Sequence, residues 1–276
     1  MEYILSGKIK IPAIGFGTWQ LSGPECRRAI GLALDTGYRH IDTAQIYGNE
    51  SDIGDALSAS GMARSDIFLT TKVWTENLKD GVFQKSVDES LKKLKTDYVD
   101  LLLIHWPVTD IPFAEQLAAL MQMQAEGKTR LIGVSNFTVA QMKEAIETIG
   151  APIVNNQVEY HPFLSQKPIL DYTRRHDMFV TAYSPLARGK INDNPVLKAI
   201  AQKHEKTVAQ ITLRWLLQHG DVAAIPKAAS DAHIKGNIDI FNFILNNEEM
   251  QQISALARPD GRLISPAWSP IWDKAA

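Results

Sequence analysis

Short runs of hydrophobic residues recur along the chain and alternate with longer stretches whose hydrophobic positions are spaced three and four apart. The short runs predict β-strands at residues 14–17, 40–42, 67–73, 99–104, 131–134, 153–158, 179–183 and 222–225. Residues 99–104 (VDLLLI) are almost continuously apolar, which is typical of a parallel strand buried on both faces. Near the start, residues 3–5 and 8–11 flank a Ser-Gly pair and predict a separate β-hairpin.

The stretches between these strands have the spacing of amphipathic helices. One begins at Ser22-Gly23-Pro24 and ends at Gly37, and others are predicted at residues 83–94, 113–127 and 208–217 and from near residues 138, 166, 194 and 231. Alternating strands and helices fit an open doubly wound sheet or a closed barrel, but eight units in 276 residues favour the barrel. We therefore expect an α/β protein in which residues 1–276 form one (β/α)8 TIM barrel with an N-terminal β-hairpin.

The charge and the cysteine content exclude several classes of protein. Lys plus Arg is 29 and Asp plus Glu is 31, which gives a formal charge of −2 and argues against nucleic-acid or membrane-surface binding. The single Cys26 and the spacing of the histidines provide neither a disulfide nor a metal site. The first residues contain no secretory signal, so we expect a cytoplasmic monomer or weak dimer whose partner is a small molecule.

Polar residues stand where several of the predicted strands end. Asp42, Lys72 and His105 end three of them, and Tyr47 follows Asp42 closely. Each residue alone has an ordinary structural explanation, such as a solvated charge or a hydrogen-bonded core histidine. The active site of a parallel barrel lies at the carboxyl ends of its strands, so these residues converge on one rim. Enclosed charges must be paired, which predicts an ion pair between Asp42 and Lys72.

These side chains suit proton transfer to a carbonyl oxygen. We expect Tyr47 to be the acid, with the Lys72 cation lowering its pKa, and neutral His105 to donate an N–H to the substrate oxygen. None of them can donate a hydride, so a reduced cofactor must supply the electrons. The chain contains no Gly-x-Gly-x-x-Gly sequence, so a Rossmann-type cofactor site is not supported.

Several motifs in a fixed order identify a family resemblance. They are residues 37–50 (GYRHIDTAQIYGNE), 70–74 (TTKVW), 104–107 (IHWP), 132–137 (IGVSNF) and 156–159 (NQVE). Together they resemble the aldo-keto reductase family, and within it the bacterial 2,5-diketo-D-gluconate reductase type. The resemblance implies that Asp42, Tyr47, Lys72 and His105 form a catalytic tetrad with Tyr47 as the acid.

The resemblance also implies NADPH bound in an extended form across the rim. Ser135, Asn136 and Gln157 would hold the carboxamide, Tyr183 would stack on the nicotinamide, and Lys227 would bind the 2′-phosphate. The remaining cofactor residues would be Gly17, Thr18, Trp19, Asp42, Ser184, Pro185, Leu186, Ser230, His233 and Asn237. The substrate would contact Trp19, Tyr47, Trp74, His105 and Trp106. A C-terminal loop at residues 258–276, with Trp268 and Trp272, would complete the substrate site.

The cofactor segment after Lys227 departs from the family pattern. Ala228 stands where a hydroxyl residue is common, His233 where an arginine is common, and Gly236 where a glutamate is common. Unlike arginine, histidine is not a permanent cation. We therefore expect NADPH to be preferred and NADH to be used as well.

The sequence leads to a reductase of small aldehydes and ketones, such as methylglyoxal or carbonyls like 2,5-diketo-D-gluconate. Two other functions stay open. A Schiff-base aldolase could use Lys72 or Lys227 as its nucleophile, although an adjacent Asp42 would keep the Lys72 amine charged. A non-catalytic subunit that senses nicotinamide cofactors is the other alternative.

Overall fold

The computed structural model describes residues 1–274 and contains the predicted hairpin and eight parallel strands. The hairpin pairs β1 (Tyr3–Ser6) with β2 (Ile9–Pro12) in antiparallel register. The parallel sheet contains β3 (Phe16–Gly17), β4 (His40–Asp42), β5 (Phe68–Val73), β6 (Val99–Ile104), β7 (Thr129–Ser135), β8 (Asn155–Glu159), β9 (Phe179–Tyr183) and β10 (Val222–Ala224), each paired with its neighbours in sequence. The predicted strands at residues 40–42, 99–104 and 179–183 have the observed bounds.

The sheet closes into a barrel between its first and last strands. Ile14 forms a parallel bridge with Ala224, and the Gly15 N–H donates to the Ala224 carbonyl at 2.8 Å. A Cβ on Gly17 would lie 2.6 Å from the Ile225 carbonyl oxygen, so glycine is needed where these two segments meet. Of the predicted strand at residues 14–17, only Phe16–Gly17 forms β3, and Ile14 forms an isolated bridge.

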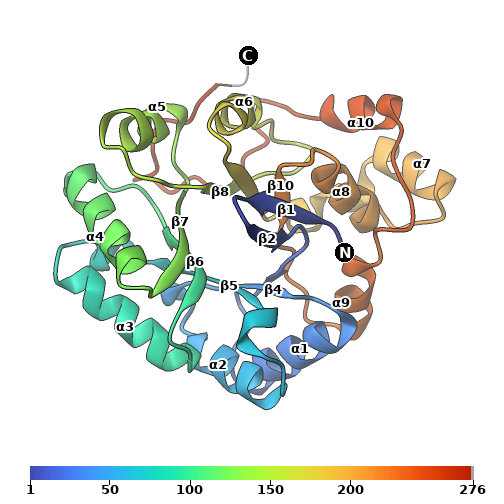
Figure 1. Cartoon of the computed structure of the whole chain (residues 1–276). Helices are drawn as coiled ribbons and strands as arrows, with labels where there is room; N and C mark the ends of the chain where they lie inside the picture. The colour runs from blue at the N-terminus through green and yellow to red at the C-terminus, as the bar shows by residue number, and fades with distance from the viewer. Residues whose placement is uncertain (275–276) are drawn as a thin grey trace.

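The helices form a ring around the strands (Figure 1). They are α1 (Gly23–Thr36), α2 (Glu50–Ala59), α3 (Val82–Leu94), α4 (Phe113–Ala125), α5 (Val139–Lys143), α6 (Lys167–Arg175), α7 (Pro195–Lys203), α8 (Val208–Leu217), α9 (Asp231–Ile238) and α10 (Asn247–Ser254). Short 3-10 turns occur at η1 (Gln45–Tyr47), η2 (Arg64–Asp66), η3 (Thr75–Asn77) and η5 (Ala187–Asp193), and a π-helical turn, η4 (Glu144–Thr148), follows α5. This arrangement confirms the predicted (β/α)8 barrel.

The sequence pattern predicts no helix at α2 or α10. The inward face of α2 is formed by Ile53, Gly54, Ala56 and Leu57, together with the buried Glu50, so large apolar residues are sparse in it. In α10 only Ile253 and Glu249 are buried. Both helices therefore lack the broad apolar stripe that identifies an amphipathic helix. By contrast, α8 has the predicted bounds, and Thr207 caps it by accepting a hydrogen bond from the Gln210 N–H.

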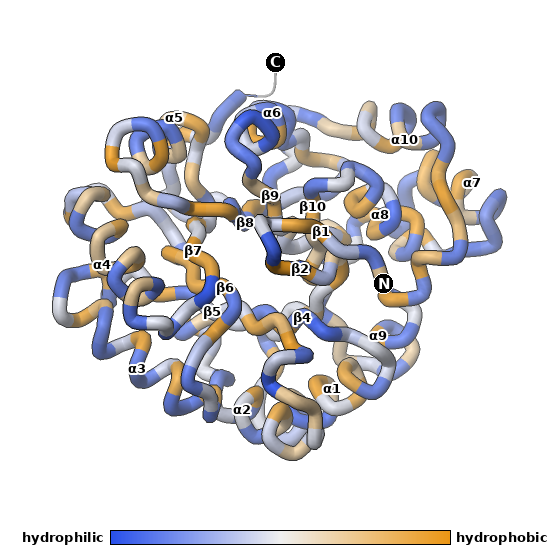
Figure 2. Tube along the Cα trace, viewed as in Figure 1, coloured by the Kyte–Doolittle hydropathy of each residue, from blue (hydrophilic) through white to orange (hydrophobic). Residues whose placement is uncertain are grey.

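The core and the hairpin determine which end of the barrel is open. Every residue of β5 and β6 is buried, and hydrophobic positions recur along the strands and helices in Figure 2. The hairpin lies across one end of the barrel in Figure 1, and its Pro12 carbonyl lies 3.2 Å from His40 Nδ1 at the start of β4. The hairpin thus covers the amino ends of the strands and leaves the carboxyl ends open. Within residues 1–274, no helix is both long enough and apolar enough to cross a bilayer.

Candidate active site

A cavity of about 550 Å³ lies at the carboxyl ends of the strands. It is lined by Gly17, Thr18, Trp19, Gln20, Asp42, Ile46, Tyr47, Trp74, His105, Trp106, Asn136, Gln157, Tyr183, Ser184, Pro185, Leu186, Arg188, Ile225, Pro226, Lys227 and Ile264. The rim therefore gathers most of the residues that the sequence analysis selected. Lys72 lies behind this lining and is completely buried.

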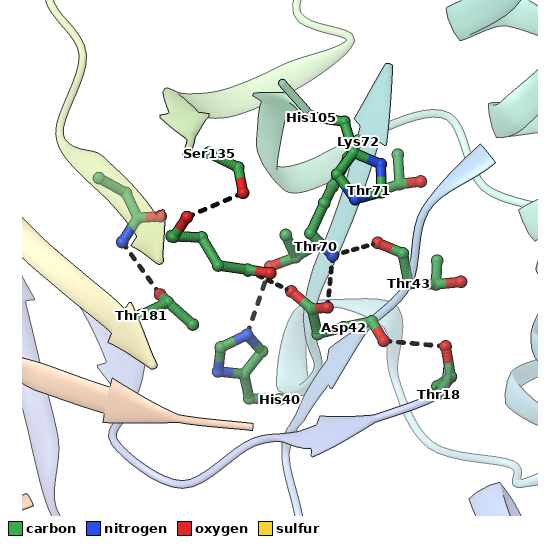
Figure 3. A network of polar contacts seen from close by, with 12 residues as sticks. Thr18, His40, Asp42, Thr43, Thr70, Thr71, Lys72, His105, Ser135 and Thr181 are labelled. Atoms are coloured by element: carbon green, nitrogen blue, oxygen red, sulfur yellow. Dashed lines mark hydrogen bonds and ion pairs between the residues drawn. The ribbon is translucent and has the colours of Figure 1, made fainter. Parts of the chain in front are cut away.

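Asp42 and Lys72 form a buried ion pair next to the cavity (Figure 3). Lys72 Nζ donates to Asp42 Oδ1 at 2.5 Å and to the Thr43 carbonyl at 2.8 Å. Burial lowers the pKa of Lys72, and the Asp42 carboxylate acts in the opposite direction. Gln157 Nε2 donates to the second carboxylate oxygen, Asp42 Oδ2, at 2.8 Å. Both oxygens of Asp42 are thus engaged, which is what a buried charge requires.

Tyr47 lies between this ion pair and the cavity. Lys72 Nζ is 5.3 Å from the centroid of the Tyr47 ring, and within residues 1–274 the phenol hydroxyl forms no hydrogen bond. Burial raises the pKa of Tyr47 well above its ordinary value, and the Asp42 carboxylate adds to this. The net shift is opposite to the lowering expected from Lys72, because desolvation of the phenol dominates. The raised pKa therefore favours the protonated phenol, the form that a proton donor needs.

His105 also lines the cavity and packs edge-to-face on Tyr47, with the two ring centroids 5.8 Å apart. Burial lowers the pKa of His105 well below its usual range, and the Lys72 cation contributes in the same direction. This shift favours the neutral imidazole, the form in which His105 could donate one N–H to a substrate oxygen. Its backbone carbonyl accepts a hydrogen bond from Asn136 Nδ2 at 3.1 Å, which ties the ends of β6 and β7 together.

The residues predicted to hold a carboxamide are brought together beside the ion pair. Tyr183 donates its hydroxyl proton to Asn136 Oδ1 at 2.7 Å, and Ser135 donates to the Gln157 carbonyl at 2.8 Å. Asn136 adopts a left-handed backbone conformation with φ of 64°, which turns the chain sharply at the strand end. Within residues 1–274, Gln157 Oε1 accepts no hydrogen bond, so it is free to receive one from a ligand.

The far end of the cavity is more exposed. Ser184, Pro185, Leu186 and Lys227 line it, and the ammonium group of Lys227 makes no ion pair with any residue in the range 1–274. Ser230, His233 and Asn237 belong to the start and body of α9 and lie outside the lining. The Ser230 hydroxyl caps α9 by accepting from the His233 N–H at 3.4 Å. An anion near Lys227 would thus lie close to the amino end of that helix.

Aromatic side chains form the mouth of the cavity. Trp19, Trp74 and Trp106 line it, as predicted. Trp268, from the C-terminal segment, packs edge-to-face on Trp74 and Trp106 with centroid distances of 6.3 and 5.0 Å. The predicted loop at residues 258–276 is thus part of the site, except for residues 275–276, which lie outside the described range.

Several lining residues are not among those that the sequence pattern predicts. Arg188 places its guanidinium 5.0 Å from the centroid of Trp19, and Gln20, Ile46 and Ile264 also reach the cavity. Gln20 and Arg188 follow selected residues by one and two positions, and Ile46 precedes Tyr47 inside the motif at residues 37–50, so their neighbours in sequence were the available signal. Nothing in the sequence pattern singles out Ile264, which comes from the irregular C-terminal segment.

Comparisons with known proteins point to one family. The model of the aldo/keto reductase family matches residues 13–258. Methylglyoxal reductase DkgB of Yersinia pestis is 41% identical over 269 residues, covering 96% of this chain and all of that protein. The crystal structure of a putative 2,5-diketo-D-gluconic acid reductase B is 49% identical, with a TM-score of 0.96 and coverage of 99% and 98%. A mutant of Gox0644, crystallised in complex with NADPH, is 32% identical, with a TM-score of 0.87 and 93% of each chain covered.

Proposed function

The chain belongs to the aldo/keto reductase family, and we propose that it reduces small aldehydes and 2-oxoaldehydes such as methylglyoxal with NADPH, and more slowly with NADH. Family membership makes the protein an NAD(P)H-dependent oxidoreductase acting on carbonyl groups. The observation that carries the proposal is the cluster of Asp42, Lys72, Tyr47 and His105 at one end of the cavity. Carbonyls like 2,5-diketo-D-gluconate are a second substrate group, favoured by the similarity to the reductase B structure.

The cavity fits an extended dinucleotide. Gln157 Oε1 and the Asn136 side chain lie at its inner end, and the exposed cation of Lys227 lies at its outer end. Residues 184–186 also line the cavity. We assign the carboxamide to Ser135, Asn136 and Gln157, the nicotinamide face to Tyr183, and the 2′-phosphate to Lys227. Ser230, His233 and Asn237 would surround the adenosine part, and Gly17, Thr18 and Trp19 the ribose nearest the nicotinamide.

Tyr47 is the proposed acid. When bound, the reduced nicotinamide supplies the hydride to the carbonyl carbon, and the carbonyl oxygen gains negative charge as a result. The Tyr47 hydroxyl then transfers its proton to this oxygen. Burial keeps the phenol protonated beforehand, and the Lys72 cation stabilises the phenolate as it forms.

His105 and Asp42 orient the reacting groups. Neutral His105 donates an N–H to the substrate oxygen and places the carbonyl beside Tyr47. Asp42 holds the Lys72 ammonium 5.3 Å from the centroid of the Tyr47 ring, and Gln157 holds Asp42. Trp19, Trp74 and Trp106 enclose the substrate and exclude water from the proton transfer.

One experiment tests the proposal against both alternatives. Purified protein is titrated with NADPH and NADH while tryptophan fluorescence is followed, and a panel of carbonyls containing methylglyoxal, phenylglyoxal and 2,5-diketo-D-gluconate is then assayed with each cofactor. We expect saturable quenching and turnover, with NADPH preferred. Binding without turnover of any carbonyl would favour the sensing subunit. Borohydride trapping of a carbonyl on Lys72 or Lys227 in the absence of nicotinamide would favour the aldolase.

A further inference from the structure

We propose that Glu159 is a positioning residue that sets substrate selectivity by anchoring the C-terminal strap, defined as residues 258–273. This inference rests on the proposed function, since it concerns the substrate wall of the same cavity. Glu159 ends β8, two residues after Gln157, and is completely buried. It does not line the cavity and cannot touch the reacting atoms.

The Glu159 carboxylate binds the strap through its backbone. The Leu263 N–H donates to Oε1 at 2.7 Å, and the Ile264 N–H donates to Oε2 at 2.8 Å. His161 Nε2 lies 2.9 Å from Oε1 and supports the carboxylate from the barrel side. Hydrogen bonds to an ionised carboxylate are about twice as strong as neutral ones, so a single side chain fixes two consecutive strap residues.

A second contact brings the strap close to the barrel just before this anchor. The Arg258 N–H donates to the Phe163 carbonyl at 3.1 Å. A Cβ on Gly261 would lie 1.7 Å from the same carbonyl oxygen, so any other residue would push the strap outwards. The chain therefore reaches Glu159 along a closely fitted path. At its other end, Asp273 Oδ2 accepts from the Val139 N–H at 2.9 Å.

The anchored part of the strap carries groups that the substrate would meet. Ile264, whose N–H is bound by Glu159, lines the cavity. Trp268, four residues further on, packs on Trp74 and Trp106 while 53% of its surface stays exposed. Because half of this indole is free of protein contacts, its position depends on where the strap is held. Releasing Glu159 would thus move one wall of the cavity and leave the pair of Asp42 and Lys72 in place.

The test variant is Glu159→Gln, because it removes the charge and one acceptor while keeping the shape. Glu249→Gln is the matched control. Glu249 is also a buried carboxylate that accepts a backbone N–H, from Asn246 at 2.9 Å, and lies 3.0 Å from a histidine nitrogen, His204 Nε2. It joins α10 to α7 and has no contact with the strap. Leu263→Pro supplies a second variant, which deletes one donor from the strap and leaves Glu159 with His161.

Two readouts are measured on each protein. The first is kcat and KM for methylglyoxal and for the bulkier phenylglyoxal, with the Kd of NADPH from fluorescence quenching. The second is the rate of limited chymotryptic cleavage after Trp268 or Trp272, which needs no turnover and is not blocked by a proline in any of the variants. For Glu159→Gln and Leu263→Pro we expect KM for phenylglyoxal to rise roughly tenfold, with kcat and the Kd of NADPH changing less than about twofold. The KM for methylglyoxal should change little, and strap cleavage should accelerate. Glu249→Gln should behave as the unmodified protein in both readouts.

Each other outcome counts against one specific claim. An equal loss of kcat on both aldehydes, or faster cleavage with unchanged KM values, would overturn the selectivity role of Glu159. Unchanged cleavage in both strap variants would overturn the anchoring itself. If the unmodified protein reduced neither aldehyde, the proposed function would fail, and the cleavage rates would still report on the anchor.

Discussion

The two ends of the cavity are built in opposite ways. At the inner end, Asp42 and Lys72 are 1% and 0% exposed, and the carboxylate and ammonium bind each other, Gln157 and a backbone carbonyl. At the outer end, Lys227 and His233 are exposed, and neither forms an ion pair within residues 1–274. A buried charge without partners is strongly unfavourable, whereas an exposed one is solvated by water. We therefore expect substitutions of Asp42 or Lys72 to lower the unfolding free energy strongly. Substitutions of Lys227 or His233 should change the cofactor preference with little loss of unfolding free energy.

The largest expected effect lies at the inner end, on Tyr47. Tyr47→Phe removes only the transferable proton, so we expect turnover to fall by about 10²–10⁴-fold, the range for a general acid. NADPH should still bind, as measured by fluorescence quenching. Tyr160→Phe is the matched control, since that phenol is also buried but lies outside the cavity, 3.1 Å from His219 Nε2. Near-normal turnover in Tyr47→Phe would mean that this phenol is not the acid.

The ion pair should couple activity to stability. Lys72→Met leaves Asp42 buried without its cation, so we expect a loss of about 3–5 kcal/mol in unfolding free energy. Turnover should fall by about 10²–10³-fold, as for other lost electrostatic stabilisers. In the double variant Asp42→Asn/Lys72→Met, both charges are gone. Denaturant titration should then show most of the stability restored, while turnover stays low. Recovery of turnover together with stability would show that the pair acts only in folding.

The outer end should affect cofactor choice and little else. We expect Lys227→Gly to lower the preference for NADPH over NADH by about tenfold to a hundredfold, the worth of one charge-assisted hydrogen bond. His233→Arg should raise the same preference, because arginine is a permanent cation that can bind phosphate with two N–H groups. The measurement is the ratio of kcat/KM for the two cofactors. The control is Lys235→Gly, which lies on α9 together with His233. An unaltered ratio in Lys227→Gly would place the 2′-phosphate elsewhere.

The smallest expected effect is on the pH dependence of the unfolding free energy, through His105 at the inner end. Burial lowers the pKa of His105, and those of His40 and His219 are lowered in the same way. Below about pH 6.5 the unfolded chain therefore binds more protons at these histidines than the folded protein does. Unfolding free energy should therefore be constant above that pH and fall as the pH drops below it. For His105→Gln the slope should be shallower by up to about 1.4 kcal/mol per pH unit. Identical slopes, measured by urea titration at pH 5.5 and 7, would mean that His105 is protonated equally in both states.

The fold was predictable where local pattern and burial agree. The strand at residues 99–104 is apolar because both of its faces are covered, and the helix at residues 208–217 has a capping residue and a broad apolar face. The helix α2 was missed because the buried Glu50 and Gly54 interrupt its apolar face. Inside the protein, the Glu50 carboxylate accepts a hydrogen bond from the Thr71 hydroxyl at 2.7 Å. Such a contact joins residues far apart in sequence and leaves no local pattern.

By itself, the sequence determined the repeat of strands and helices and the residue types at the strand ends, since both depend on spacing and on the termini of local elements. It also determined that Asp42 and Lys72 must be paired, because enclosed charges require partners. Only the tertiary structure decided that burial, more than Lys72, governs the pKa of Tyr47, because desolvation depends on everything packed around a group. It likewise decided that Glu159 holds the strap, because the N–H groups of Leu263 and Ile264 meet this carboxylate only after more than a hundred intervening residues have folded.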